Sequence, residues 1–251
     1  MSTPFLSVII PSYREEKNFA RGVLDEVVAY LKSQTFTWEV ILTDDGSTDK
    51  TVELLKDFAA KHENVRVVEN PHRGKGPTVS SGMLAARGQY RLFTDFDQST
   101  PLSDFEKFLP YLDDGYDVVI GSRALEGAKR EKEPIHRHVM GMVFNVLVQM
   151  IAVPGIHDTQ CGFKLFTAKA TEELFPKLVV YGNHVRQDAF TGAFDVELLL
   201  LARRHKFSIA EVPVGWHHNA TERVSPLKDS ARMFADIVKI RLADISQKYK
   251  K

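Results

Sequence analysis

Short apolar runs alternate with amphipathic stretches along the first half of the chain. Five runs are short enough for strands buried on both faces, at residues 6–11, 38–43, 65–69, 90–95 and 117–121. Between them, apolar side chains recur at helical spacing in residues 17–33 and 52–58, after Gly76, and from Pro101 to Leu112. This alternation predicts an α/β fold with a mostly parallel central sheet and helices on both faces.

The second half of the chain is less regular. Residues 122–134 are polar and charged and predict a loop, whereas residues 163–167 and 209–214 predict strands and residues 193–206 predict a helix. From Pro226 onward, apolar and basic residues alternate in the pattern of an amphipathic helix. The length of 251 residues suits one large domain better than two small ones.

One apolar stretch, residues 139–153, raises the question of a membrane span. It is interrupted by Asn145 and Gln149 and is shorter than the roughly 20 residues that a span needs, so a buried or interfacial helix is expected. The N-terminus up to Pro11 has neither a basic region nor a small-residue cleavage site, which argues against a signal peptide.

Composition narrows the function classes. The 33 basic and 33 acidic residues give a formal charge of zero, whereas nucleic-acid binders usually carry a basic excess, so no nucleic-acid partner is expected. A single cysteine, Cys161, excludes an intrachain disulfide and fits a reducing compartment, which favours a cytoplasmic protein. Without a metal-type partner spacing, this thiol is expected to be packed rather than reactive.

Polar residues follow four of the predicted strands. In an open parallel sheet, ligands bind beyond the carboxyl ends of the strands. The residues found there are Pro11 to Glu15 after the first strand, Asp44 and Asp45 after the second, Asp95-Phe96-Asp97 after the fourth, and Gly121-Ser122-Arg123 after the fifth. Acids and an arginine at one edge predict a cation site next to a place for phosphate.

The triplet at residues 95–97 is the strongest candidate. Asp95 and Asp97 are two residues apart, so on an extended segment their carboxylates share a face and can hold Mg²⁺ or Mn²⁺ together with substrate phosphates. A solvated turn at a strand end explains the triplet almost as well. For Asp44 and Asp45, turn and cap chemistry competes with a role in accepting hydrogen bonds from a nucleobase or ribose.

Basic residues near this edge can serve a phosphate. His72-Arg73-Gly74-Lys75-Gly76 opens a predicted helix but lacks the P-loop pattern, so Lys75 contacts a donor or belongs to a plain surface turn. Arg123 and Arg223 are suited to bidentate contact with phosphate, although a lone arginine is more often a surface residue.

The motifs taken in order resemble the family-2 glycosyltransferases of the GT-A fold. The resemblance is carried by SVIIPSYREE, VILTDDGSTDKT, RGKGPTVSSGML, LFTDFDQSTP, VVIGSR, DTQCGFKLF and GAFDVELL, together with a segment from Trp216 to about residue 225. It is strongest to the branch of dolichyl-phosphate β-glucosyltransferases and dolichyl-phosphate mannose synthases. The resemblance implies one GT-A (Rossmann-like) domain over residues 1–251, with a nucleotide-binding half at 1–122, an acceptor half at 123–225 and an amphipathic helix at 226–251.

The activity implied by the resemblance is an inverting transfer of a hexose, glucose favoured, from a nucleotide sugar to a polyprenyl or dolichyl phosphate, with UDP-glucose as the favoured donor and Mg²⁺ or Mn²⁺ as cofactor. Alternatives are mannosyl transfer from GDP-mannose, transfer to a sugar hydroxyl, and a non-catalytic nucleotide-sugar-binding module. A nucleotidyltransferase is disfavoured because the loop at residues 12–16 has no glycine. Peripheral contact with the inner face of the cell membrane is expected through residues 139–153 or the amphipathic tail.

The resemblance also assigns roles to individual residues. Asp97, with Asp95, would bind the metal, Arg123 and Arg223 would stabilise phosphates, and Asp195 would lie on the acceptor side and serve as base for a hydroxyl acceptor. The nucleotide sugar would contact Pro11, Tyr13, Glu15, Asp44, Asp45, Lys75, Asp95 and Phe96. The family commonly has a small residue between the two acids, so Phe96 puts the donor fit of this chain in question.

Overall fold

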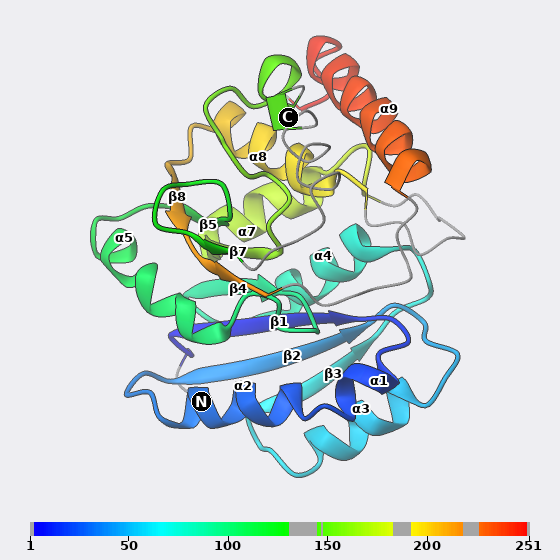
Figure 1. Ribbon diagram of the computed structural model, residues 1–251, viewed down its shortest axis with the longest axis vertical. Coiled ribbons are helices and arrows are strands. Elements are labelled where there is room, and N and C mark those ends of the chain that lie inside the picture. The colour runs from blue at the N-terminus through cyan, green and yellow to red at the C-terminus, as the bar shows by residue number, and fades with distance from the viewer. Residues whose placement is uncertain (1–2, 131–144, 147, 183–191, 218–225, 250–251) are drawn as a thin grey trace.

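A seven-stranded sheet forms the centre of the molecule, in a computed structural model that describes residues 3–130, 145–146, 148–182, 192–217 and 226–249 (Figure 1). The strand order is β3-β2-β1-β4-β7-β5-β8. The strands are β1 (Leu6–Ser12), β2 (Trp38–Asp44), β3 (Val65–Glu69), β4 (Tyr90–Thr94), β5 (Val118–Ser122), β7 (Phe163–Thr167) and β8 (Ile209–Pro213). All pairs are parallel except those of β7, which runs antiparallel between β4 and β5.

Helices cover both faces of the sheet. Alternate residues of β1 point to opposite faces, so Ile9 packs in one buried cluster while Val8 and Ile10 pack in the other. The cluster around Ile9 is closed by α4 (Lys75–Ala85), α7 (Ala168–Leu174), η2 (Phe175–Lys177), α8 (Phe194–Arg204) and α9 (Pro226–Ile245). The opposite face carries α1 (Glu16–Phe19), α2 (Val23–Lys32), α3 (Thr51–Ala59), η1 (Leu102–Lys107) and α5 (Leu109–Asp113). The predicted α/β architecture is confirmed.

Each predicted strand lies within one residue of an observed one, and the remaining differences have local causes. Residues 17–33 form two helices rather than one, because Gly22 adopts a left-handed conformation (φ 77°) just before α2. The stretch after Pro101 begins as a 3₁₀ helix and becomes α-helical at Leu109. The predicted loop at residues 122–134 contains β6 (Lys129–Arg130), which pairs with β9 (Gly215–Trp216) in a small second sheet.

The apolar stretch at residues 139–153 falls partly outside the described residues. Within the described part, Val148, Ala152 and Val153 are buried in the same cluster as α8 and α9, whereas Val146 and Met150 are exposed. Among the described residues, no helix combines the length and the apolar character needed to cross a bilayer.

Candidate active site

The carboxyl ends of the neighbouring strands β2, β1 and β4 bring together the loops that were predicted to carry chemistry. Beyond β1, the Tyr13 ring stacks on the His72 ring with centroids 4.3 Å apart and planes inclined by 11°. The Arg14 guanidinium lies 5.2 Å from the Tyr13 ring centroid, and its backbone N–H donates to Ser47 in the loop after β2. Aromatic and basic groups are therefore available where a nucleotide base is expected.

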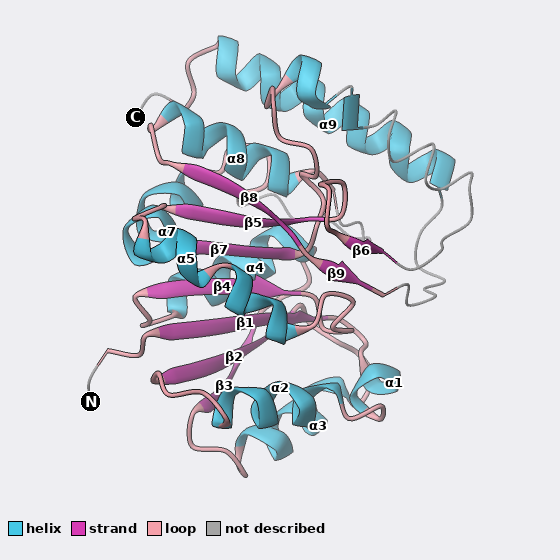
Figure 2. Ribbon diagram, turned by 60° about the vertical axis from the view of Figure 1, so that its left-hand side comes forward, coloured by secondary structure: helices cyan, strands magenta, loops and turns pink. Residues whose placement is uncertain are grey.

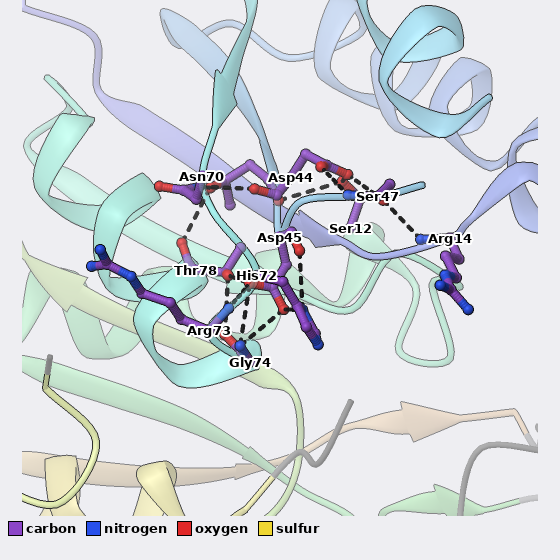
Figure 3. A network of polar contacts seen from close by, with 11 residues as sticks. Ser12, Arg14, Asp44, Asp45, Ser47, Asn70, His72, Arg73, Gly74 and Thr78 are labelled. Carbon is purple, nitrogen blue, oxygen red and sulfur yellow. Dashed lines mark hydrogen bonds and ion pairs between the residues drawn. The ribbon is translucent and has the colours of Figure 1, made fainter. Parts of the chain in front are cut away.

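The Asp45 carboxylate organises the loop that leads into α4 (Figure 3). The residue is only 3% exposed, and its carboxylate accepts hydrogen bonds from the backbone N–H groups of Arg73 (2.8 Å) and Gly74 (3.0 Å) and from the Thr78 hydroxyl (2.8 Å). The His72 ring lies 2.8 Å from the second carboxylate oxygen. With four partners in the protein, this carboxylate fixes the shape of the loop that leads into α4, and a direct contact between Asp45 and a nucleobase stays a prediction.

Asp44 has a similar internal role in the loop after β2. Its carboxylate accepts from the Ser12 hydroxyl at 3.2 Å, which ties the ends of β1 and β2 together, and from the backbone N–H of Ser47 at 2.7 Å. The adjacent Gly46 has φ 70°, and a Cβ there would lie 2.7 Å from the backbone nitrogen of His72. Asp44 and Asp45 therefore both accept hydrogen bonds within the surrounding loops, as the turn interpretation expects. Contact between Asp44 and a nucleotide stays a prediction.

A cluster of charged groups lies at the end of β4. The Lys75 ammonium, at the first residue of α4, pairs with Asp95, and the neighbouring Asp97 accepts from the backbone N–H of Ser99 at 3.0 Å. Burial and the charge of Asp95 raise the pKa of Asp97. For Lys75, burial opposes the charged form, but Asp95 and Asp195 outweigh it and raise the pKa. The structure thus brings Lys75, Asp95, Asp97 and Asp195 into one electrostatic cluster.

Gly162 makes room for the Asp95 carboxylate. A Cβ at this position would collide with both carboxylate oxygens and the carboxyl carbon of Asp95. The glycine belongs to the loop immediately before β7, the strand inserted beside β4. The antiparallel strand therefore positions a backbone wall against the candidate metal site.

Asp195 is held by a lysine that the sequence did not single out. The Lys164 side chain is 0% exposed on β7, and its ammonium lies 2.7 Å from an Asp195 oxygen and donates to the Cys161 carbonyl. Burial raises the pKa of Asp195, and the charges of Lys164 and Lys75 oppose that rise. Since Asp195 lies in the first turn of α8, this ion pair joins α8 to β7 of the sheet.

Arg123 is aligned by a second carboxylate from the loop before β7. Its guanidinium forms two hydrogen bonds with Asp158, of 2.7 and 2.9 Å, and lies 5.6 Å from the centroid of the Trp216 ring. Burial would raise the pKa of Asp158, but Arg123 overrides it and lowers the pKa to about 2. The backbone N–H of Asp158 donates in turn to Glu211 at 2.7 Å. Arg123 is therefore held in one orientation beside the Asp95 charge, which also raises its pKa.

The other predicted site residues differ in accessibility. Pro11 is buried in β1, and Glu15 is buried with its carboxylate accepting from Asn18 at 2.6 Å. Phe96 is 3% exposed and packs in the cluster under α2 and α5, so its burial does not support a direct donor contact. Arg223 lies outside the described residues.

A cavity opens next to the charged cluster. It has a volume of about 440 Å³, and its lining includes Asp97, Gln98 and Pro101 on one side and Tyr30 and His217 on others. Cavities of this size are typical of small-molecule sites. The space beside Asp97 is therefore large enough for part of a ligand.

The family is decided by comparison of this chain with known sequences. The model of glycosyl transferase family 2 matches residues 7–175, a stretch that runs from the second residue of β1 past the end of β7 and includes all the charged groups of the cluster except Asp195. The chain belongs to glycosyltransferase family 2. The resemblance inferred from the motifs is confirmed.

Several curated relatives are named dolichyl-phosphate beta-glucosyltransferase. A dolichyl-phosphate beta-glucosyltransferase of Drosophila melanogaster is 39% identical over 98% of this chain and 79% of its own length. The human protein of the same name is 36% identical over 96% of this chain and 76% of its own length.

Solved structures show the same fold at lower identity. Mannosyl-3-phosphoglycerate synthase from Rubrobacter xylanophilus has a TM-score of 0.66 and 19% identity over 99% of this chain and 76% of its own. Glucosyl-3-phosphoglycerate synthase from Mycobacterium tuberculosis, solved with Mn²⁺, UDP and glucosyl-3-phosphoglycerate, has a TM-score of 0.63 and 19% identity over 96% of this chain and 79% of its own. Both are glycosyltransferases, so the GT-A fold expected for this chain is confirmed.

The acids of the site suit a metal that is shared with a substrate. Within the described parts of the chain, no group of three or more His, Cys, Asp or Glu side chains can hold a metal ion by itself. Asp95 and Asp97 nevertheless offer two carboxylates at one strand end, and Mg²⁺ typically uses one or two carboxylates together with substrate phosphates. The donor set therefore fits a metal–diphosphate complex better than a resident metal.

The motifs also left out several residues of the site. Asp158, Gly162 and Lys164 all lie in the segment DTQCGFKLF, which carried part of the resemblance. Their roles depend on contacts with residues 35, 67 and 31 positions away, and no local pattern reports such contacts. Cys161, in the same segment, is buried with its pKa raised to about 11, as expected for a packed thiol.

Proposed function

We propose that this family-2 glycosyltransferase moves glucose from UDP-glucose to the phosphate of a polyprenyl lipid, with inversion at the anomeric carbon. The observation that carries the proposal is the cluster of Lys75, Asp95, Asp97 and Asp195, with the aligned Arg123 beside it, at the carboxyl ends of the strands. The sugar and the acceptor are inferred from the shared name of the curated relatives, dolichyl-phosphate beta-glucosyltransferase.

Residues 1–122 contribute most of the donor side in this proposal. Tyr13 and His72 offer a stacked aromatic pair to the base, while Asp44 and Asp45 keep the surrounding loops in place. A Mg²⁺ or Mn²⁺ ion held by Asp95 and Asp97 would supply positive charge to the departing diphosphate. Arg123 adds a fixed positive charge next to Asp95.

Residues 123–225 contribute the acceptor side. A phosphate monoester has a second pKa near roughly 6 and is already largely ionised at neutral pH, so its attack needs little general-base assistance. Asp195 is ion-paired with the buried Lys164. In this proposal Asp195 holds that ammonium in place beside the site of the anionic acceptor. Burial raises the pKa of Asp195, and the Lys164 ammonium limits that rise because it stabilises the charged carboxylate.

A donor panel tests the proposal. Purified full-length protein is incubated with UDP-glucose or GDP-mannose, Mg²⁺ or Mn²⁺, and a polyprenyl phosphate, and the lipid products are identified by mass spectrometry. We expect glucosyl polyprenyl phosphate from UDP-glucose. A preference for GDP-mannose would select mannosyl transfer, products formed only on sugar hydroxyls would select the hydroxyl acceptor, and binding without turnover would leave a non-catalytic module.

Location is proposed on the same basis. A polyprenyl phosphate resides in a bilayer, so the enzyme has to meet its acceptor at a membrane surface. Attachment at the cytoplasmic, inner face of the cell membrane remains a prediction.

A further inference from the structure

Exposed apolar side chains are concentrated on two segments of the molecule. Seven large hydrophobic residues are exposed in the described parts of the chain, and six of them lie on α9 or on residues 145–152. On α9 they are Phe234, Val238, Leu242 and Ile245, with exposed fractions of 42%, 37%, 57% and 63%. Such a concentration marks an interaction surface rather than the scattered apolar residues of an ordinary surface.

The spacing of these four residues places them on one face of α9. Steps of four, four and three residues return to the same side of a helix, so the residues form a stripe about 16 Å long at 1.5 Å per residue. The opposite side of α9 is used by the core, where Ile237 and Ile240 are 0% exposed. α9 therefore has two apolar faces, and the fold buries only one of them.

The charges around the stripe indicate what covers it. Among the described side chains from 231 to 249, the exposed ionisable groups, Arg232, Lys239 and Lys248, are all basic. The two acids of this segment, Asp236 and Asp244, are buried, 2% and 7% exposed, and they pair with residues that include Lys239 and Arg204. Among the side chains described on this segment, the stripe is therefore flanked by exposed basic groups, and such a surface complements an anionic lipid surface.

We propose that the stripe Phe234–Val238–Leu242–Ile245 of α9 docks the enzyme flat on an anionic lipid bilayer. Val146 and Met150 are exposed on a segment whose C-terminal neighbour Pro154 accepts from Arg203 at the end of α8, next to Arg204, which donates to Asp244 of α9. The contact surface is inferred from α9 itself, and only the reason for docking on a membrane rests on the proposed lipid acceptor.

Docking through α9 would orient the site usefully. Figure 2 shows α9 beyond the β8 end of the sheet, with β3 and α3 at the far end. With α9 on the bilayer, the β2 and β3 end, which carries the Asp45 loop, points toward the water that supplies a soluble donor. Asp195 lies in the first turn of α8, which packs against α9, so the proposed acceptor side is turned toward the lipid.

Vesicle sedimentation of the full-length protein tests the proposal. The matched variants are the pair Leu242→Gln with Ile245→Gln on the stripe, and Leu84→Gln, which makes the same change at an exposed residue of α4. Vesicles contain phosphatidylcholine alone or with about one third phosphatidylglycerol. We expect wild type and Leu84→Gln to bind the anionic vesicles more tightly than the neutral ones, with binding weakened by salt.

The variant with both stripe substitutions should bind the anionic vesicles at least about tenfold more weakly than wild type, because two apolar side chains are lost from the contact with the bilayer. Equal binding of the pair and wild type would overturn the proposal, as would no binding of wild type at low salt. A wild-type dimer that the pair converts to a monomer in sedimentation velocity would make the stripe an interface between copies instead.

Activity separates this proposal from the proposed function. All three proteins should transfer glucose equally to a short-chain, water-soluble prenyl phosphate, since none of the changed residues belongs to the site. Vesicle binding without any glucosyl transfer would support docking through α9 and reject the proposed function. Glucosyl transfer without vesicle binding would support the proposed function and reject docking through α9.

Discussion

Replacing Asp158 with asparagine should lower the stability of the protein in a pH-dependent way. The carboxylate forms a two-bond ion pair with Arg123, and its pKa falls from an ordinary 3.8 to about 2. At 1.36 kcal/mol per pKa unit, this shift corresponds to about 2 kcal/mol of stability at neutral pH. Since the variant also leaves the largely buried Arg123 without its carboxylate, we expect a loss of at least about 2 kcal/mol at pH 7.

The sign of the pH dependence follows from the direction of the shift. A depressed carboxyl pKa stabilises the fold fully above the unfolded value and loses that effect as the pH falls toward the folded value. The difference between wild type and Asp158→Asn should therefore be largest above pH 5 and should fall to roughly half by pH 3, since the window lies between about 4 and about 2.

Urea unfolding followed by circular dichroism measures this difference at each pH. The matched control is Asp113→Asn, which changes an exposed aspartate of α5 and should alter stability by less than about 0.5 kcal/mol. A stability difference that stays constant from pH 7 to pH 3 would refute the reasoning, because the loss would then not arise from the charge of Asp158.

Three further predictions concern the segment before β7 and the strand itself. Gly162→Ala should leave the fold intact by circular dichroism but weaken Mn²⁺ binding in the presence of UDP by about tenfold or more, because the new methyl displaces the Asp95 carboxylate. Lys164→Met should destabilise the protein by on the order of 3 kcal/mol at pH 7, and this deficit should shrink in acid as Asp195 is protonated, which urea unfolding would detect. The Cys161 thiol should react with a thiol reagent at pH 8 only when the protein is unfolded, and fast reaction of the native protein would contradict its burial.

The strands were predictable because each is a short apolar run that ends at a polar loop. Their direction was not, since β7 has the pattern of a buried strand whether it runs parallel or antiparallel. The break before α2 also escaped the pattern, because Gly22 lies within a stretch whose apolar spacing remains helical. Hydrophobic periodicity reports burial and says little about chain direction.

The acids of the site were predictable from their place after strands one, two and four. The partners of these acids were not predictable. Asp45 accepts hydrogen bonds from residues 72–78, and Asp158 and the base Lys164 pair with Arg123 and Asp195, which are distant in the sequence. The motif also could not show that Phe96 is buried, because the middle residue of a triplet at a strand end can face the core or the ligand. Such pairings arise only when the sheet brings the loops together.

Glucosyl transfer by the Asp97→Asn variant tests the central claim most directly. The substitution keeps the shape of the side chain and removes the charge that the proposed metal–diphosphate complex requires. With UDP-glucose, Mn²⁺ and a polyprenyl phosphate, we expect wild type and Asp113→Asn to form the glucosyl lipid at equal rates, and Asp97→Asn to lose activity by about a hundredfold or more. Product formation by Asp97→Asn at the wild-type rate, or by wild type in excess chelator, would contradict the account.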